Sequence, residues 1–203
     1  MRRICLYTAL LSSLVMLAKG PNVNIIDSFY VAKDSILNVY TLSDAAGKLT
    51  MDSIGFGYYN QLGSRCTRTM AVDSTTRLGF QYRLLNTWSE PDTLVLNNTG
   101  STIYTSPYWL SDGLTLYYAS NDTTGKGGLD IYMTVYNTTT GQFSRPKNIG
   151  APFNSAGNDY LYVLDETQGI GYWASDDRAG TDSVTVYKFE SREPVLWTPT
   201  LER

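Results

Sequence analysis

Three kinds of sequence marker recur in this chain at one constant spacing of 55 residues, and this spacing constrains the fold more than any other feature. The markers are an Ala-Ser pair after two aromatic residues, a tyrosine that closes a strand-like segment, and a proline three positions after an aromatic residue. The matched residues are Ala119 with Ala174, Ser120 with Ser175, Tyr132 with Tyr187, and Pro91 with Pro146. Such agreement indicates internal repeats, which must be recognised before a fold is assigned.

Residues 106–154 are the clearest copy of the repeat, and they read as short strands joined by tight turns. Aromatic and β-branched residues mark the strands, and Asp112-Gly113 is typical of a hairpin turn. The predicted strands run over 108–110, 114–120 and 129–136, and a fourth begins at Phe143 and leaves through Pro146. A period of ~40–55 residues with about four strands is typical of β-propeller blades, which stack because one such sheet leaves both faces exposed.

Composition favours an all-β fold and argues against nucleic acid as a partner. The chain holds 16 Tyr and 17 Gly, and only 17% of its residues are charged. No long stretch has the three-to-four spacing of an amphipathic helix. A formal charge of −3 provides no basic surface for a phosphate backbone.

The first twenty residues read as a secretory signal peptide. Arg2 and Arg3 precede an apolar run from Ile4 to Ala18, which is short for a membrane span, so a retained anchor is the weaker alternative. We therefore expect an exported protein of the periplasm, outer membrane or cell surface, without a stable membrane span after cleavage. Cys66 is then alone, and because the chain has no histidine to activate it, we interpret it as a buried structural residue.

Residues 21–66 diverge from the repeat. We divide the chain into a signal peptide (1–20), a divergent N-terminal β segment (21–66) and propeller blades (67–203). Within the divergent segment, the sequence predicts strands over 24–32 and 36–42, a turn over 43–48, and one strand over 49–59 with possible bulges at Gly55 and Gly57.

The number of blades is small. Residues 21–203 hold little more than three copies of 55 residues, whereas closed propellers have ~4–8 blades. We expect a compact or incomplete β-propeller of three to four antiparallel four-stranded blades. Completion of a partial propeller by self-association, and a chain that is a fragment of a larger envelope protein, remain as alternatives.

Two segments carry a resemblance to a known family: SDGLTLYYASNDTTGKGGLDIY (111–132) and FSRPKNIGAPFNS (143–155). They resemble the PD40 repeat, a WD40-like Asp-Gly repeat of TolB-type β-propellers that is related to the propellers of prolyl oligopeptidases. Similar copies occur in exported envelope proteins of Bacteroidetes-type bacteria, so the resemblance implies a propeller in the cell envelope. It is good over 102–190, partial over 67–101, and absent before. The second copy has Thr167-Gln168 in place of Asp-Gly and Thr185 in place of Asp130.

Packing and turn chemistry recur in the repeat, so we predict structural roles for the residues that define it. These residues are Asp112, Gly113, Ala119, Ser120, Asp130, Tyr132, Pro146, Ala174, Ser175 and Tyr187. Acidic residues in two equivalent loops could be read as calcium ligands, but their spacing departs from that of known calcium loops. We interpret them as residues that cap turns, and we predict neither a metal nor a cofactor. These acids are Asp122, Asp130, Asp176, Asp177 and Asp182.

Aromatic residues on predicted loops are the candidate binding residues, because they can stack on sugars or peptides, and packing between blades explains most of them equally well. They are Tyr108, Trp109, Tyr160 and Trp173. A glycoside hydrolase would need two facing carboxylates, for which the candidates are Glu90, Asp159, Asp165 and Glu166. We expect a non-catalytic binding or scaffold module that uses a propeller face to hold a protein or glycan of the envelope. A carbohydrate-active propeller enzyme is the alternative.

Overall fold

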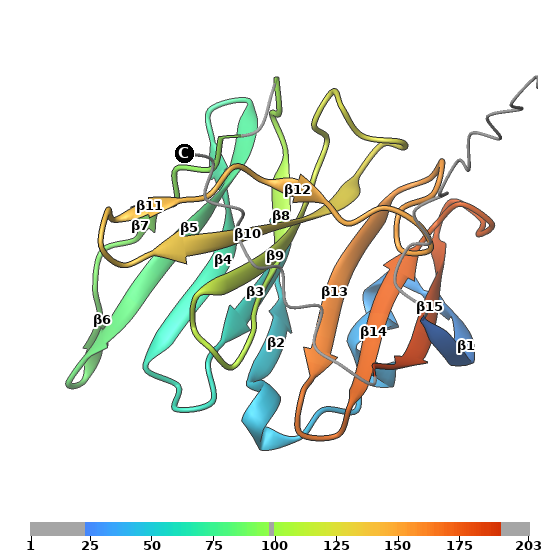
Figure 1. Ribbon diagram of the computed structural model, residues 1–203, viewed down its shortest axis with the longest axis horizontal. Coiled ribbons are helices and arrows are strands. Elements are labelled where there is room, and N and C mark those ends of the chain that lie inside the picture. Colours follow the sequence, from blue (N-terminus) through green and yellow to red (C-terminus); the bar gives the residue numbers. More distant parts are fainter. Residues whose placement is uncertain (1–22, 98–99, 192–203) are drawn as a thin grey trace, which may run out of the picture.

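The computed structural model describes residues 23–97 and 100–191, whose strands form antiparallel sheets (Figure 1). The all-β prediction is therefore confirmed, whereas the predicted signal peptide lies outside the described residues. Three sheets contain these strands, and two short 3-10 helices connect β1 to the first sheet.

The first sheet has four main strands and two short outer ones, the second has three main strands and two short outer ones, and the third has four main strands. The first sheet contains β2 (Lys48–Met51), β3 (Phe56–Tyr59), β4 (Arg65–Val72), β5 (Thr75–Leu84), β6 (Thr87–Trp88) and β7 (Asp92–Thr93). The second contains β8 (Tyr104–Trp109), β9 (Thr115–Ser120), β10 (Asp130–Asn137), β11 (Gln142–Phe143) and β12 (Lys147–Asn148). The third contains β13 (Asp159–Asp165), β14 (Ile170–Ser175), β15 (Ser183–Glu190) and β1 (Asn24–Ala32). The helices are η1 (Lys33–Val39) and η2 (Asp44–Ala46).

The first strand belongs to the last sheet. β1 pairs antiparallel with β15, from Asn24 opposite Glu190 to Ala32 opposite Ser183, and Figure 1 shows the two strands, blue and red, side by side. The Asn24 amide also donates a hydrogen bond of 3.1 Å to the Glu190 carboxylate, across 166 residues of sequence. The third sheet is thus built from both ends of the described chain.

The second and third sheets keep the 55-residue spacing of the sequence. Ala119 and Ala174 occupy the same place in β9 and β14, both are fully buried, and each pairs with the residue twelve positions later. The strands before them share a bulge at which Ser106 and Leu161 have φ of +54° and +56°. Positive φ is costly for a residue other than glycine, so its recurrence marks a built-in feature of the repeat.

Both faces of the second sheet are covered, as the aromatic pairs predict for stacked sheets. All six residues of β9 are buried. Because side chains alternate along a strand, Tyr117 and Tyr118 point to opposite faces. The ring of Tyr117 stacks on Tyr162 of the third sheet at 4.4 Å, while Tyr118 stacks on Tyr132 of its own sheet at 6.1 Å.

The three sheets share one packed interior. β8 packs across the strands of the first sheet, and β13 packs across the second. Tyr108 of β8 lies edge-on to Tyr58 of the first sheet at 5.1 Å, and its hydroxyl donates a hydrogen bond of 2.6 Å to the Leu164 carbonyl of the third. The first and third sheets also meet, since the rings of Phe56 and Tyr160 are 5.9 Å apart.

The aromatic-Ser-x-Pro motif forms the outer edge of the first and second sheets. Ser89 and Ser144 lie 55 residues apart, and each serine exchanges two hydrogen bonds with the neighbouring long strand. The Ser89 N–H donates to the Tyr82 carbonyl at 2.8 Å while the Ser89 hydroxyl accepts from the Tyr82 N–H at 3.1 Å. Ser144 does the same with Val135, at 2.8 and 3.0 Å. The motif ends at Pro91 in the first sheet and at Pro146 in the second. It breaks each sheet edge into two-residue strands, which hinders pairing of that edge with another chain.

Two predictions for the divergent segment are wrong. Residues 36–42 do not form a strand, because η1 covers Lys33–Val39 and buries Ile36 completely against Val184 and Val186. A short apolar run fits a helical turn as well as a strand, and here the chain must turn from the third sheet to the first.

Residues 49–59 form two strands rather than one. The Asp52 carboxylate accepts hydrogen bonds from the N–H groups of Ile54 and Gly55, at 2.8 and 3.0 Å, and this makes the turn between β2 and β3. Gly55 is therefore a turn residue, and Gly57 allows close approach, since a Cβ there would lie 2.8 Å from the Thr50 hydroxyl. The first sheet extends across the boundary expected at 66/67, which falls inside β4.

Candidate functional site

The four candidate binding aromatics occupy different environments. Tyr108, Tyr160 and Trp173 are buried, with exposed fractions of 2%, 9% and 2%, because their rings pack between the sheets. Trp173, for example, stacks on Tyr187 at 4.7 Å. Trp109 alone of the four lines a groove. Burial leaves Trp109 as the one of these rings that a ligand can reach.

The groove lies between the first and second sheets and has a volume of about 1030 Å³. Its walls come from β3, β4, β5 and β7 on one side and from β8, β10 and β11 on the other. Turns at 60–62 and 110–114 also contribute to its lining. Cavities of this size, lined by aromatic rings with a few polar groups, are the usual form of a ligand site.

Five rings in continuous contact line the groove, and we refer to them as the aromatic belt. In order they are Tyr82, Phe80, Trp109, Phe143 and Tyr136, with centroid separations of 4.7, 6.3, 6.0 and 5.1 Å. The indole N–H of Trp109 donates a hydrogen bond of 2.9 Å to the hydroxyl of Thr67, which fixes the central ring. The belt joins residues of both sheets, so it exists only once the sheets have packed together.

The sequence predicts only part of this belt. It indicates Trp109 as a binding residue and places Phe143 in the repeat motif. Phe80, Tyr82 and Tyr136 carry no motif of their own. Tyr82 precedes the outer-edge motif of the first sheet and Tyr136 that of the second, so their positions beside the motif are the available signal.

Neutral polar side chains dominate the rim of the groove. The exposed ones are Gln61, Thr93, Asn97, Ser111, Thr138 and Gln142. The charged residues that line the groove are Arg65, Asp92 and Asp112. The Asp112 carboxylate is occupied by its own turn, since one oxygen accepts from the N–H groups of Leu114 and Thr115 and the other from the Thr115 hydroxyl, all at 2.7–2.8 Å. Burial raises the pKa of Tyr58, at the base of the groove, to about 12, so its phenol is neutral.

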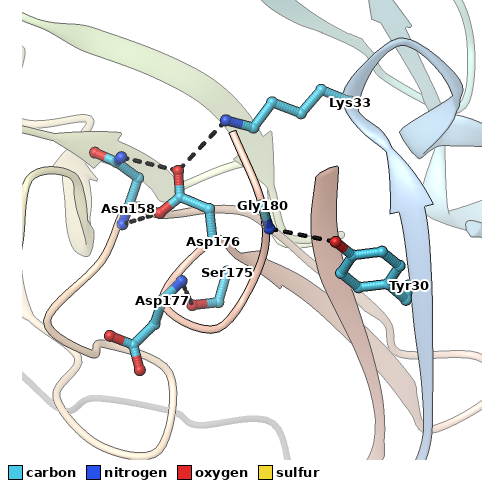
Figure 2. Close-up of polar contacts among 7 residues, drawn as sticks. All are labelled: Tyr30, Lys33, Asn158, Ser175, Asp176, Asp177 and Gly180. Carbon is cyan, nitrogen blue, oxygen red and sulfur yellow. Dashed lines mark hydrogen bonds and ion pairs between the residues drawn. The ribbon is translucent and has the colours of Figure 1, made fainter. Parts of the chain in front are cut away.

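The polar residue after each Ala-Ser pair holds the start of its own sheet. The Asn121 side-chain oxygen accepts from the Ile103 N–H at 2.8 Å, and 55 residues later the Asp176 carboxylate accepts from the Asn158 N–H at 2.7 Å. Figure 2 shows Asp176 between Asn158 and the ammonium of Lys33, 3.5 Å away. Burial raises the pKa of Asp176, but the Asn158 hydrogen bonds and Lys33 outweigh it, so the pKa lies below its usual value.

Two other loop acids, Asp130 and Asp122, also serve the backbone. Asp130 is buried and accepts from the N–H groups of Lys126 and Gly127 and, at 2.8 Å, from the Asn148 amide. Asp122 accepts from the Thr124 N–H at 2.8 Å. These contacts support the turn-capping interpretation. Within residues 23–97 and 100–191, no group of three or more His, Cys, Asp or Glu side chains is placed to hold a metal ion.

The candidate hydrolase acids do not line the groove. Asp165 accepts from the N–H groups of Ser43, Thr167 and Gln168, and Glu166 accepts from the Ser111 N–H at 2.7 Å. Asp159 is fully buried and accepts from the Ser155 N–H and hydroxyl, and its burial raises the carboxyl pKa. Glu90 is exposed between β6 and β7. The hydrogen bonds of Asp159, Asp165 and Glu166 thus cap turns and connect strands.

Cys66 is buried in β4 and forms no disulfide. Burial raises the pKa of its thiol, which disfavours the nucleophilic thiolate. Both observations agree with the structural interpretation of this residue.

No helix in the described part of the chain is long and apolar enough to cross a membrane. Comparison of this chain with protein-family models, with curated proteins and with solved structures found no match.

Proposed function

We propose that this protein is a non-catalytic binding or scaffold module whose protein or glycan partner occupies the groove between the first and second sheets. The aromatic belt that lines the groove is the observation that carries the proposal. Large rings that face solvent leave apolar surface exposed, and a ligand that covers them gains the free energy of burial. Concave aromatic surfaces with a polar rim are the usual ligand sites of proteins.

We further propose that the three sheets are blades of a compact propeller of the PD40 type. The pairing of β1 with β15 supports this arrangement, because it unites an early strand and a late strand in one sheet. The contacts of the first sheet with both the second and the third support it as well. Completion by self-association is the alternative, and analytical ultracentrifugation of the mature protein separates a monomer from an assembly.

The turn-capping roles of Asp112, Asp165 and Glu166 support a non-catalytic role, because their oxygens already accept backbone hydrogen bonds. The runner-up is a glycoside hydrolase, which needs two carboxylates, and Asp92 and Asp112 are the two that line the groove. Incubation with polysaccharides followed by chromatography of the products tests this alternative. Release of oligosaccharides by the wild type but not by Asp92→Asn would replace the binding proposal by the enzymatic one.

We place the protein in the envelope of the cell, in the periplasm, at the outer membrane or on the surface. The basic and apolar pattern of residues 1–20 and the resemblance to PD40 repeats of exported proteins support this location. Mass spectrometry of the protein from fractionated cells tests it, with an envelope fraction and loss of about the first twenty residues as the expected result. A mass larger than the present chain would instead favour the fragment alternative.

A pair of matched variants tests the groove as the binding site. Tyr82 in the belt is 51% exposed, and Tyr30 on β1 is 65% exposed but lies in the third sheet, outside the groove. Ligands selected from a glycan array and from phage-displayed peptides should lose affinity for Tyr82→Ala and keep it for Tyr30→Ala. Ligands of both classes that bind the two variants equally well would refute the groove as the site.

A further inference from the structure

The chemistry of the groove selects among ligand classes, and the aromatic belt favours a ligand with flat apolar faces. The central rings of the belt, Trp109 and Phe143, lie 6.0 Å apart and are partly exposed. Aromatic faces carry negative potential and attract the polarised C–H groups that cover one face of a sugar ring. Neighbouring rings of the belt are tilted by 47–89° to one another, so they offer separate stacking faces to successive units of a ligand and not one flat platform.

The rim favours a ligand without charge. Its exposed polar side chains are mainly amides and hydroxyls, which both donate and accept hydrogen bonds and so match hydroxyl groups. Among the charged lining residues, Arg65 and Asp92 have opposite sign, and Asp112 keeps its negative charge while it accepts the hydrogen bonds of its turn, so the three formal charges sum to −1 (+1 −1 −1). A charged ligand would need a complementary field to offset its desolvation, and these residues provide none of one sign.

Two of the long strands that line the groove, β5 and β10, offer no open edge to an extended peptide, because short strands cover their outer sides. The outer side of β5 is paired by β7 at Gly79 and Phe80 and by β6 at Arg83 and Leu84. The outer side of β10 is paired in the same way by β11 and β12. Recognition of a peptide by strand addition requires an unpaired edge, so this common mode has no template on β5 or β10, and the outermost strands β7 and β11 are only two residues long.

We propose that the groove binds a neutral oligosaccharide whose sugar rings stack on the aromatic belt and whose hydroxyls bond to the amide and hydroxyl rim. The inference rests on the proposed function of the groove as the ligand site and names the chemical class of the ligand. The match is one of charge as well as of shape, since a nearly neutral groove meets an uncharged ligand.

A protein partner is the competing occupant, and it would use different residues. Leu62 and Val95 on the rim are 82% and 73% exposed, and an apolar protein surface would cover them. Sugar binding depends on Tyr82 and Gln142, whereas protein binding depends on the aliphatic rim.

Isothermal titration calorimetry of the full chain tests the proposal with linear neutral hexasaccharides of glucose, mannose and N-acetylglucosamine as probes. We expect at least one probe to bind, with affinity reduced on the order of tenfold in Tyr82→Ala and in Gln142→Ala. Tyr30→Ala and Leu85→Ala, exposed residues outside the groove, should leave the affinity unchanged. All four side chains are at the surface, so circular dichroism can verify that each variant folds.

Four results would overturn the inference. If none of the neutral probes binds at millimolar concentration, or if binding is the same in Tyr82→Ala, the groove is not a site for neutral sugars. Selected peptides that bind in a manner dependent on Leu62 and Tyr82 would keep the groove as the binding site but assign it to a protein. Binding of uronic acid oligosaccharides in preference to neutral ones would contradict the argument from charge.

Discussion

Asn154 provides the sharpest test of how loop side chains hold the sheets in register. It is 2% exposed, and its amide clamps the start of β10. Its oxygen accepts from the Ile131 N–H at 2.8 Å, and its nitrogen donates to the Ile131 carbonyl at 2.9 Å and to the Asn148 side-chain oxygen at 2.7 Å. Asn154→Ala removes all three hydrogen bonds.

The three losses differ in size. The Ile131 carbonyl still accepts from the Ile149 N–H at 3.2 Å, and the Asn148 oxygen still accepts from the Gly150 N–H at 2.9 Å. The Ile131 N–H keeps no side-chain partner in this buried position, which costs roughly 1–3 kcal/mol, and the other two bonds are worth about 0.5–1.5 kcal/mol each. We therefore expect the free energy of unfolding to fall by about 3 kcal/mol, or the melting temperature by about 6–12 °C for a domain of this size.

Urea unfolding followed by far-UV circular dichroism measures this loss. Asn86→Ala is the matched control, because Asn86 is exposed in the turn between β5 and β6, and surface substitutions usually change stability by less than about 0.5 kcal/mol. A loss below about 1 kcal/mol for Asn154→Ala with an unchanged m-value would show that the buried clamp does not limit stability.

Three further predictions concern packing, pH and reactivity. Gly171→Ala should cost about 1–3 kcal/mol, because its Cβ would lie 2.1 Å from the buried ring of Phe189, and thermal unfolding measures it. The pKa of Asp176 is lowered in the folded state, so its stabilising contribution is present above about pH 4 and is lost as pH falls through the folded pKa. Asp176→Asn should therefore be less stable than the wild type at pH 7 and equally stable at pH 2; a stability gap that persists at pH 2 would contradict this. Iodoacetamide should modify Cys66 slowly in the native protein and rapidly in urea, and fast native modification would contradict its burial.

Much of the repeat could be read from the sequence, because local chemistry reappears wherever the same strand position reappears. Ala119 and Ala174 recur since only a small side chain fits between closely packed sheets, and both are fully buried. Serine recurs at positions 89 and 144 because its hydroxyl accepts a hydrogen bond from a strand N–H that a backbone carbonyl would otherwise accept at the sheet edge. Such requirements act over a few residues, so they leave a periodic trace.

The exposure of the aromatic residues could not be read in the same way. Alternation along a strand predicts two faces but does not tell which face a neighbouring sheet covers, and here both faces of the second sheet are covered. Tyr108 and Trp109 are adjacent in sequence, yet one lies in the core and the other lines the groove.

The sequence by itself determined the all-β class, the 55-residue spacing of the second and third sheets, and the turn-capping chemistry of residues such as Asp112 and Asp122. All of these depend on neighbours close in the chain. Only the tertiary structure decided that β1 completes the third sheet and that rings from two sheets align into the aromatic belt. Both depend on contacts between segments far apart in sequence, which the burial of apolar surface brings together without leaving a local pattern.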